Sequence, residues 1–118
     1  MLDHVTIRAS DRAASETFYR TVLGALGLQP VRDDAEIFGW DDFGIIAADA
    51  DHPATEHLHV GFVASSRAVE DFHRAALDAG YQSNGEPGER PQYGAGYYAA
   101  YVLDPDGTNV ELVWRGQG

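Results

Sequence analysis

The sequence predicts an α+β domain built from two similar βαβββ modules. An alternating strand pattern followed by a helical pattern occurs twice, and its landmarks recur 55 positions apart, from His4 to His59 and from Ser10 to Ser65. The chain has 118 residues, which is the usual length of one compact domain. We therefore expect a single domain over residues 1–118, with module 1 at residues 1–55 and module 2 at residues 56–118.

Module 1 begins with a half-buried strand, because Val5 and Ile7 alternate with the polar His4 and Thr6. Ser10 or Asp11 then offers an N-cap for a helix that ends at Gly24. The apolar stripe of this helix consists of Ala14, Phe18, Val22 and Leu23. Three short strands are expected near residues 28–33, 35–40 and 43–48.

Module 2 repeats this order. A strand over residues 57–65 is followed by Ser66 as the expected N-cap and by a helix that ends at Gly80. Three more strands are expected near residues 81–85, 97–104 and 108–114, the last two joined by a tight DPDG turn. Residues 84–96 are rich in Gly and Pro and form the one long predicted loop, either a substrate-contacting lid or a plain connector.

Charge and composition exclude several classes of partner. The chain has 8 basic and 19 acidic residues, a formal net charge of −11, which repels nucleic acid and anionic membrane surfaces. It contains no long apolar segment and no signal-peptide pattern, so a cytoplasmic location is expected. It has no cysteine, so any transition metal would be bound by His and carboxylate side chains.

Three strands carry a ligand-type residue in the phase opposite to their apolar residues. These residues are His4, His59 and Glu111, and we expect all three on the sheet face away from the helices. Two imidazoles and one carboxylate can bind a divalent ion and leave coordination positions open. The alternative interpretation is that the histidines are hydrogen-bonded strand residues and that Glu111 is exposed to solvent. His57 shares the phase of His59 and is an alternative ligand.

Four segments carry a resemblance to a known family. The order LDHVTI, FYRTVLGALGL, HLHVGFVA and DPDGTNVELVW resembles the vicinal oxygen chelate superfamily, which includes glyoxalases, extradiol dioxygenases, fosfomycin-resistance enzymes and bleomycin-resistance proteins. The resemblance covers essentially the whole chain. It implies paired βαβββ modules whose sheets curl into a cup around a metal, with the helices on the outer face, and it implies a homodimer.

The resemblance also implies a metal site. The family's histidine of the first strand corresponds to His4, the histidine that opens the second module to His59, and the glutamate of the last strand to Glu111. Glyoxalases have a fourth ligand, a glutamate in the last strand of the first module, where this chain has Ile45, Ile46 and Ala47. This difference argues against lactoylglutathione lyase activity and favours a three-ligand site of the dioxygenase or fosfomycin-resistance kind.

Further site residues follow from the resemblance and from position. Arg8 corresponds to an arginine that some glyoxalases use to bind substrate, although an arginine at a strand end is commonly a surface residue. Glu111 and Tyr101 are the candidate catalytic residues, with Tyr101, on the strand before the DPDG turn, as a proton donor. Candidates for the pocket lining are Tyr93, Tyr97 and Tyr98 at its mouth and Trp40 and Phe43 in its wall, with core packing as the alternative for all of these aromatic residues. His52 and His73 are expected to be exposed.

The predicted function is that of a metal-dependent lyase, isomerase or dioxygenase that binds two adjacent oxygens of a small substrate. The ion would be Fe, Mn, Ni or Zn, acting as a Lewis acid. The alternative is a metal-free small-molecule-binding protein of the bleomycin-resistance type, for which the negative charge and the tyrosines suit a cationic guest. The sequence leaves open whether His4 completes a site in its own chain or in a partner chain.

Overall fold

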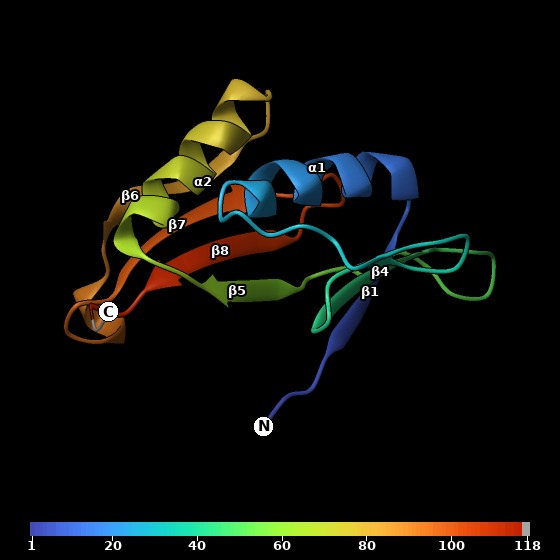
Figure 1. Cartoon of the computed structure of the whole chain (residues 1–118), viewed down its shortest axis with the longest axis horizontal. Coiled ribbons are helices and arrows are strands. Elements are labelled where there is room, and N and C mark those ends of the chain that lie inside the picture. Colours follow the sequence, from blue (N-terminus) through green and yellow to red (C-terminus); the bar gives the residue numbers. More distant parts are fainter. Residues whose placement is uncertain (117–118) are drawn as a thin grey trace.

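The computed structural model describes residues 1–116 and has the predicted α+β fold with two βαβββ modules (Figure 1). Module 1 comprises β1 (Val5–Ala9), α1 (Arg12–Gly24), β2 (Arg32–Asp33), β3 (Phe38–Gly39) and β4 (Phe43–Ala47). Module 2 comprises β5 (His59–Val63), α2 (Ser66–Asp78), β6 (Ser83–Glu89), the 3₁₀ helix η1 (Pro91–Tyr93), β7 (Tyr98–Leu103) and β8 (Asn109–Trp114). The last two residues of the predicted domain, Gln117 and Gly118, lie outside the described residues.

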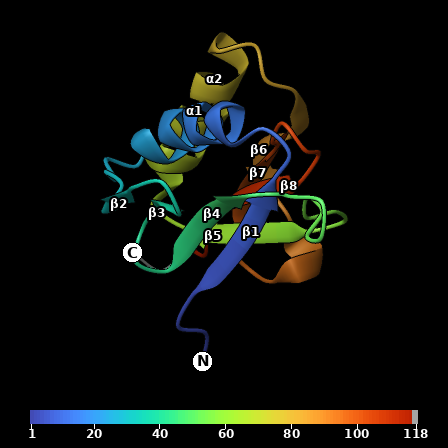
Figure 2. The same ribbon diagram turned by 90° about the vertical axis from the view of Figure 1, so that its right-hand side faces the viewer.

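Each module forms its own four-stranded mixed sheet. The strand orders are β1-β4-β3-β2 and β5-β8-β7-β6, with β1 parallel to β4 and β5 parallel to β8. Both helices lie on the same side of the molecule and contact each other, α1 over β1 and β4 and α2 over β6, β7 and β8 (Figures 1 and 2). The helices therefore cover the outer faces of the sheets, while β1 and β5 are edge strands, each paired with one neighbour.

The helix starts follow the sequence signals with one correction. Asp11 caps α1, and its carboxylate accepts a hydrogen bond of 3.2 Å from the Ala14 amide. The cap of α2 is Ser65 and not the predicted Ser66. Ser65 has an extended backbone and its hydroxyl accepts a bond of 3.3 Å from the Ala68 amide, whereas Ser66 is already the first helical residue.

The predicted loop over residues 84–96 is wrong in its first half, because β6 continues to Glu89. Pro87 is tolerated there because β6 is an edge strand and its register with β7 shifts on both sides of Gly85. The register shifts let a Gly- and Pro-rich segment remain paired with β7, which sequence alternation alone does not reveal.

One apolar core joins the two modules. The Phe43 ring of β4 meets the Phe62 ring of β5 with centroids 5.2 Å apart, and Phe18 of α1 meets Tyr81 at 4.8 Å. The largest side chains that are fully buried include Tyr19, Phe18, Phe38, Phe72, Leu23 and Ile45. Because residues of both modules contribute to this cluster, neither module buries its apolar face alone.

His73 is buried and not exposed as the sequence suggested. It is 8% exposed, and its Nε2 lies 2.7 Å from the Ser83 hydroxyl of β6. Burial lowers its pKa below the ordinary value. His73 therefore holds α2 against β6 as a neutral hydrogen-bonding side chain at neutral pH.

The DPDG turn connects the last hairpin to α1 through a hydrogen bond. One oxygen of the buried Asp104 carboxylate accepts hydrogen bonds from the amides of Asp106 and Thr108, at 2.8 and 2.9 Å. Its other oxygen accepts a bond of 2.7 Å from the hydroxyl of Tyr19. Gly107 closes the turn with φ +82, which favours glycine. The turn predicted from DPDG is therefore present and also links the two modules.

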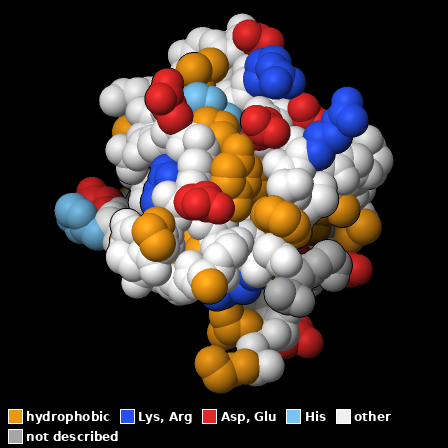
Figure 3. Space-filling model, turned by 90° about the vertical axis from the view of Figure 1, so that its left-hand side faces the viewer, with side chains coloured by type: hydrophobic (Ala, Val, Ile, Leu, Met, Phe, Trp, Pro, Cys, Tyr) orange, Lys and Arg blue, Asp and Glu red, His pale blue; other side chains and the backbone are white. Residues whose placement is uncertain are grey.

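Charged side chains are interspersed with other types on one face of the molecule. On the face shown in Figure 3, acidic side chains are separated by polar, basic and apolar ones and do not gather in one patch. Neither helix in the described part of the chain is long and apolar enough to cross a lipid bilayer.

The link between Tyr19 and Asp104 should contribute measurably to stability. Tyr19→Phe removes one hydrogen bond from a buried carboxylate, and we expect the free energy of unfolding to fall by about 1–3 kcal/mol in urea denaturation. Tyr81→Phe is the matched control, because the Tyr81 hydroxyl bonds to no side chain within residues 1–116, and it should change stability by less than about 0.5 kcal/mol. Equal effects of the two variants would contradict the assigned role of Asp104.

Candidate functional site

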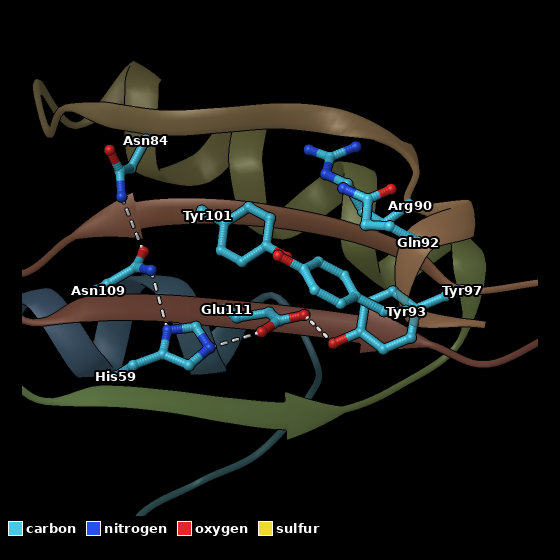
Figure 4. A pocket seen from close by; sticks show the side chains of 9 residues that line it. All are labelled: His59, Asn84, Arg90, Gln92, Tyr93, Tyr97, Tyr101, Asn109 and Glu111. Atoms are coloured by element: carbon cyan, nitrogen blue, oxygen red, sulfur yellow. Dashed lines mark hydrogen bonds and ion pairs between the residues drawn. The ribbon is translucent and has the colours of Figure 1, made fainter.

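A cavity of about 520 Å³ lies on the open face of the module 2 sheet (Figure 4). The residues that line it are His59, Asn84, Arg90, Gln92, Tyr93, Tyr97, Tyr101, Asn109 and Glu111. Val110 and Leu112 of β8 are buried in the core on the helix side, so the alternation of the strand directs Glu111 to the opposite face. The cavity is polar and aromatic, the composition expected of a site for a small polar molecule.

The sheet register explains why distant residues meet in this cavity. Glu111 of β8 is paired with Gly61 of β5 on one side and with Tyr101 of β7 on the other. Two positions along the strands, on the same sheet face, His59 is paired with Asn109. Gly61 presents no side chain beside Glu111, and a Cβ built there would lie 3.6 Å from Glu111 Oε1.

Glu111 is the most enclosed charged group of the cavity. It is only 3% exposed, so the alternative interpretation of a solvent-exposed glutamate is wrong. Its Oε1 lies 2.8 Å from His59 Nε2, and its Oε2 accepts a hydrogen bond from the Tyr97 hydroxyl. The two oxygens thus have different partners, and the partner of Oε1, His59, is a residue that commonly binds metal ions.

The other ring nitrogen of His59 is also fixed. Its Nδ1 lies 2.9 Å from Asn109 Nδ2, and Asn109 Oδ1 accepts a bond of 3.0 Å from Asn84 Nδ2. This direction suits a His59 that is protonated on Nε2 and donates to Glu111. If the side-chain amides of Asn109 and Asn84 are both turned by 180°, the direction of these hydrogen bonds reverses. Asn109 then accepts a hydrogen bond from His59 Nδ1–H, and the lone pair of His59 Nε2 becomes available to a ligand.

The pair of His59 and Glu111 fits the spacing of two metal ligands. Two donor atoms bound at about 2.1 Å and at roughly right angles to one ion are about 3.0 Å apart. The observed separation of Nε2 and Oε1 is 2.8 Å. Within residues 1–116, however, no group of three ligand-type side chains converges, so one chain by itself offers two ligands and not three.

Two tyrosines beside Glu111 remain protonated at neutral pH. Burial, together with the hydrogen bond to Glu111, raises the pKa of Tyr97 to about 12. Burial and the Glu111 charge also raise the pKa of Tyr101. Both phenols are therefore hydrogen-bond donors at neutral pH rather than bases.

The sequence-predicted site residues fall into two groups. His59, Glu111, Tyr93, Tyr97 and Tyr101 line the module 2 cavity. His4, Trp40 and Phe43 line a second cavity of about 260 Å³ in module 1.

His4 is therefore not beside Glu111 in the same chain. It lies directly before β1, its side chain is 64% exposed, and its Nδ1 is 2.7 Å from Asp3 Oδ1. The expectation that the three ligand-type residues share one sheet face was wrong for a single chain, because β1 belongs to one sheet and β5 and β8 to the other.

Module 1 has no ligand-type side chain at the place that corresponds to Glu111. The pair Thr6–Gly44 in β1 and β4 occupies the same register position as Gly61–Glu111 in β5 and β8. The residue equivalent to Glu111 is thus Gly44 and not one of the predicted Ile45, Ile46 and Ala47. A Cβ at Gly44 would lie only 2.7 Å from Ile37 Cδ1, so a longer side chain there requires Ile37 to move.

The remaining candidates lie elsewhere. Arg8 donates to the Ala47 carbonyl at 3.3 Å and lines neither cavity. His57 has a left-handed backbone (φ 58) and an exposed side chain outside both cavities. Tyr98 packs against the core, so its prediction for the pocket mouth was wrong. His52 is exposed as predicted and is hydrogen-bonded to Asp49.

Four lining residues were not predicted from the sequence. Asn109 shares the phase of Glu111 on the same strand, and that signal could have identified it. Asn84, Arg90 and Gln92 belong to the segment expected to be a loop, and their orientation depends on the irregular pairing of β6 with β7.

Comparisons with known proteins identify relatives of the whole chain. The family model described as Glyoxalase/Bleomycin resistance protein/Dioxygenase superfamily matches residues 1–112. A glyoxalase/bleomycin resistance protein from Albidiferax ferrireducens T118, known from a crystal structure, is 31% identical with a TM-score of 0.84. The similarity covers 98% of this chain and 99% of that one.

Two more distant structures are similar in fold. A lactoylglutathione lyase from Agrobacterium tumefaciens is 23% identical, with a TM-score of 0.69 and coverage of 97% of this chain and 92% of that one. A glyoxalase/bleomycin resistance protein/dioxygenase family enzyme from Burkholderia phytofirmans PsJN is 22% identical, with a TM-score of 0.73 and coverage of 96% and 97%. Among curated proteins, none matches the sequence.

The hydrogen bond between Tyr97 and Glu111 predicts a pH effect. Tyr97 keeps its proton up to about pH 12 in the folded protein but has a reference pKa of 10.0, so the folded state binds more protons between these values. The stability contributed by Tyr97 is therefore present below pH 10 and is lost as the pH rises through this window. Glu111→Gln should lower the Tyr97 pKa, as followed by NMR of its ζ-carbon.

Glu56→Gln is the matched control for this titration, because Glu56 is exposed and lines neither cavity. An unchanged Tyr97 pKa in Glu111→Gln would contradict the assigned contact.

Proposed function

Because the chain belongs to the glyoxalase/bleomycin resistance protein/dioxygenase superfamily, we propose that it is a divalent-metal-dependent enzyme acting on a small substrate with two adjacent oxygens. The observation that carries the proposal is the convergence of His59 Nε2 and Glu111 Oε1, 2.8 Å apart, in a polar cavity. In the proposed site His59 and Glu111 are joined by His4 of a second copy of the chain.

Neighbouring side chains support a metal-ligand role for His59 and Glu111. Ligating histidines usually donate their second ring nitrogen to a partner, and ligating carboxylates are usually hydrogen-bonded. Here Asn109 is the partner of the second ring nitrogen of His59, at 2.9 Å from Nδ1, and Tyr97 is the hydrogen-bond partner of the Glu111 carboxylate, at Oε2. These partners would hold the two ligands in place before an ion binds.

The proposed dimer follows from the separation of the two cavities. His4 lies with Trp40 and Phe43 in module 1, while His59 and Glu111 lie in module 2. The edges of β1 and β5 are unpaired within the described chain, and a two-fold dimer can bring module 1 of each copy over module 2 of the other. Two equivalent three-ligand sites would result, each with an apolar wall from Trp40.

The cavity residues have clear parts in such chemistry. A bound divalent ion would supply Lewis-acid polarisation of the two substrate oxygens. Tyr101, which keeps its proton at neutral pH, would donate a hydrogen bond to one of those oxygens and stabilise negative charge that develops on it. Tyr97 would keep its hydrogen bond to Glu111 and hold that ligand in place. The nitrogen and oxygen donor set, with no cysteine in the chain, suits Fe, Mn, Ni or Zn.

A metal-free binding protein is the second candidate. It is favoured by the fact that His59, Glu111 and Tyr97 already satisfy one another by hydrogen bonds, so the cavity needs no ion to remain intact. Its tyrosines would then stack on an aromatic or cationic guest.

Metal content separates the two candidates. We expect purified protein, reconstituted with Fe, Mn, Ni or Zn, to bind one ion per chain by mass spectrometry. His59→Ala, Glu111→Gln and His4→Ala should each lower metal affinity by roughly tenfold or more. His52→Ala and His57→Ala are the matched controls, because both residues lie outside the two cavities. Wild-type protein that binds none of the four metals would favour the metal-free candidate.

Complementation tests the shared site. If His4 acts on the partner's site, mixing the His4→Ala and His59→Ala variants after dissociation creates mixed dimers with one intact site and one that lacks both residues. Metal binding should then return in part on mixing. If each site lies within one chain, mixing restores nothing, and that result would refute the proposed dimer.

A further inference from the structure

We infer that Arg90 is an anion-binding residue of the module 2 cavity and that it selects substrates carrying a single carboxylate. This inference builds on the proposed function by naming a substrate class for the same cavity. The argument rests on the position of Arg90, on the backbone that accommodates it and on the charges around it.

Arg90 is held over the cavity by contacts that leave part of its guanidinium available. The guanidinium carbon lies 5.4 Å from the centre of the Tyr101 ring. Its Nη2 donates to the Glu86 carbonyl at 2.8 Å, and its Nη1 donates to the Glu89 carbonyl at 3.3 Å. A guanidinium has five N–H donors, so others remain for a ligand on the cavity side (Figure 4).

Strand β6 provides the space that Arg90 occupies. A Cβ built at Gly88 would lie 2.9 Å from Arg90 Nη1, and one built at Gly85 would lie 3.3 Å from Nη2 and 2.7 Å from Tyr101 Cδ1. Two missing side chains thus let the arginine fold back along its own strand. A side chain at Gly88 or Gly85 would therefore displace the guanidinium from this position.

The charge of Arg90 is not neutralised by the protein. Among residues 1–116, no Asp or Glu side chain forms an ion pair with it, although the chain has a formal charge of −11. A cation that faces a cavity without a carboxylate partner suits an anionic ligand, and the planar guanidinium matches a carboxylate in particular.

The two ends of the cavity carry opposite charges. Glu111 of β8, Tyr101 of β7 and Gly85 of β6 lie in one register row, so two strand spacings of about 4.8 Å separate the Glu111 strand from β6. A substrate can therefore place its carboxylate at Arg90 and its paired oxygens near Glu111 and His59. Because the cavity has one cation, Arg90, and one carboxylate, Glu111, it favours a ligand with a single negative charge over a phosphate dianion. The same Arg90 charge disfavours a cationic guest.

The test uses metal-free protein, so that failure of the metal proposal does not affect it. Benzoate, benzamide and phenyl phosphate are titrated by calorimetry and by NMR of the Arg90 side chain. Benzoate should bind roughly tenfold or more tightly than its neutral isostere benzamide, and no more weakly than phenyl phosphate. Equal affinity for benzoate and benzamide, or a preference for phenyl phosphate, would overturn the assignment of a carboxylate-binding residue.

Two variants locate the effect. Arg90→Gln should abolish the preference for benzoate, while Arg74→Gln, on the exposed surface of α2, should retain it. Gly88→Ala should reduce the preference by displacing the flexible guanidinium, whereas Gly24→Ala, whose Cβ would meet nothing within 4 Å, should not. Circular dichroism verifies that each variant is folded. Retention of the full preference in folded Arg90→Gln would refute the inference.

Discussion

The buried carboxylate of Asp104 is the interaction on which the rest of the structure depends. It organises the turn between β7 and β8 through the amides of Asp106 and Thr108, and it binds the Tyr19 hydroxyl of α1 in the other module. The two most characteristic sequence segments, FYRTVLG and DPDG, are therefore in direct contact. A carboxylate that is almost fully buried is tolerated only with such complete hydrogen bonding, so the native turn depends on the Tyr19 hydroxyl of α1 as well as on its own amides.

The position of the cavity follows from that hairpin. Once β7 and β8 are paired in register, Glu111 is opposite Tyr101. The alternation of β8 then buries Val110 and Leu112 in the core and directs Glu111 to the opposite face, where it lines the cavity. The glycines at both ends of this register row, Gly61 and Gly85, leave space for the side chains of their neighbours. Regular strand pairing thus places His59, Tyr101, Asn109 and Glu111 on one face, while the irregular pairing of β6 adds Asn84.

The periodicity of the sequence was sufficient to predict which side chains share one face of a strand, but not which strands share one sheet. The 3.6-residue and two-residue patterns located both helices and the strands β1, β4, β5, β7 and β8, and they placed Glu111 opposite Val110 and Leu112. They missed most of β6, which was expected to be a loop. They could not reveal that β1 joins a different sheet from β5, because strand partners depend on contacts between distant segments. For the same reason His73 was expected to be exposed, and Arg90 was missed because its place depends on the register shifts of β6.

The two modules share a plan but differ at one register position. In module 2 the strand paired with β5 carries Glu111 beside Gly61, whereas in module 1 the strand paired with β1 carries Gly44 beside Thr6. Ile37 occupies the space that a side chain at Gly44 would need, so module 1 has an apolar surface where module 2 has a carboxylate. If module 1 of one copy covers module 2 of another, it contributes the His4 imidazole and the rings of Trp40 and Phe43, together with Arg32 and Asp41, which line the same cavity. Because the position equivalent to Glu111 is Gly44, it supplies no fourth ligand to the proposed site, which leaves coordination positions open for the two oxygens of a substrate.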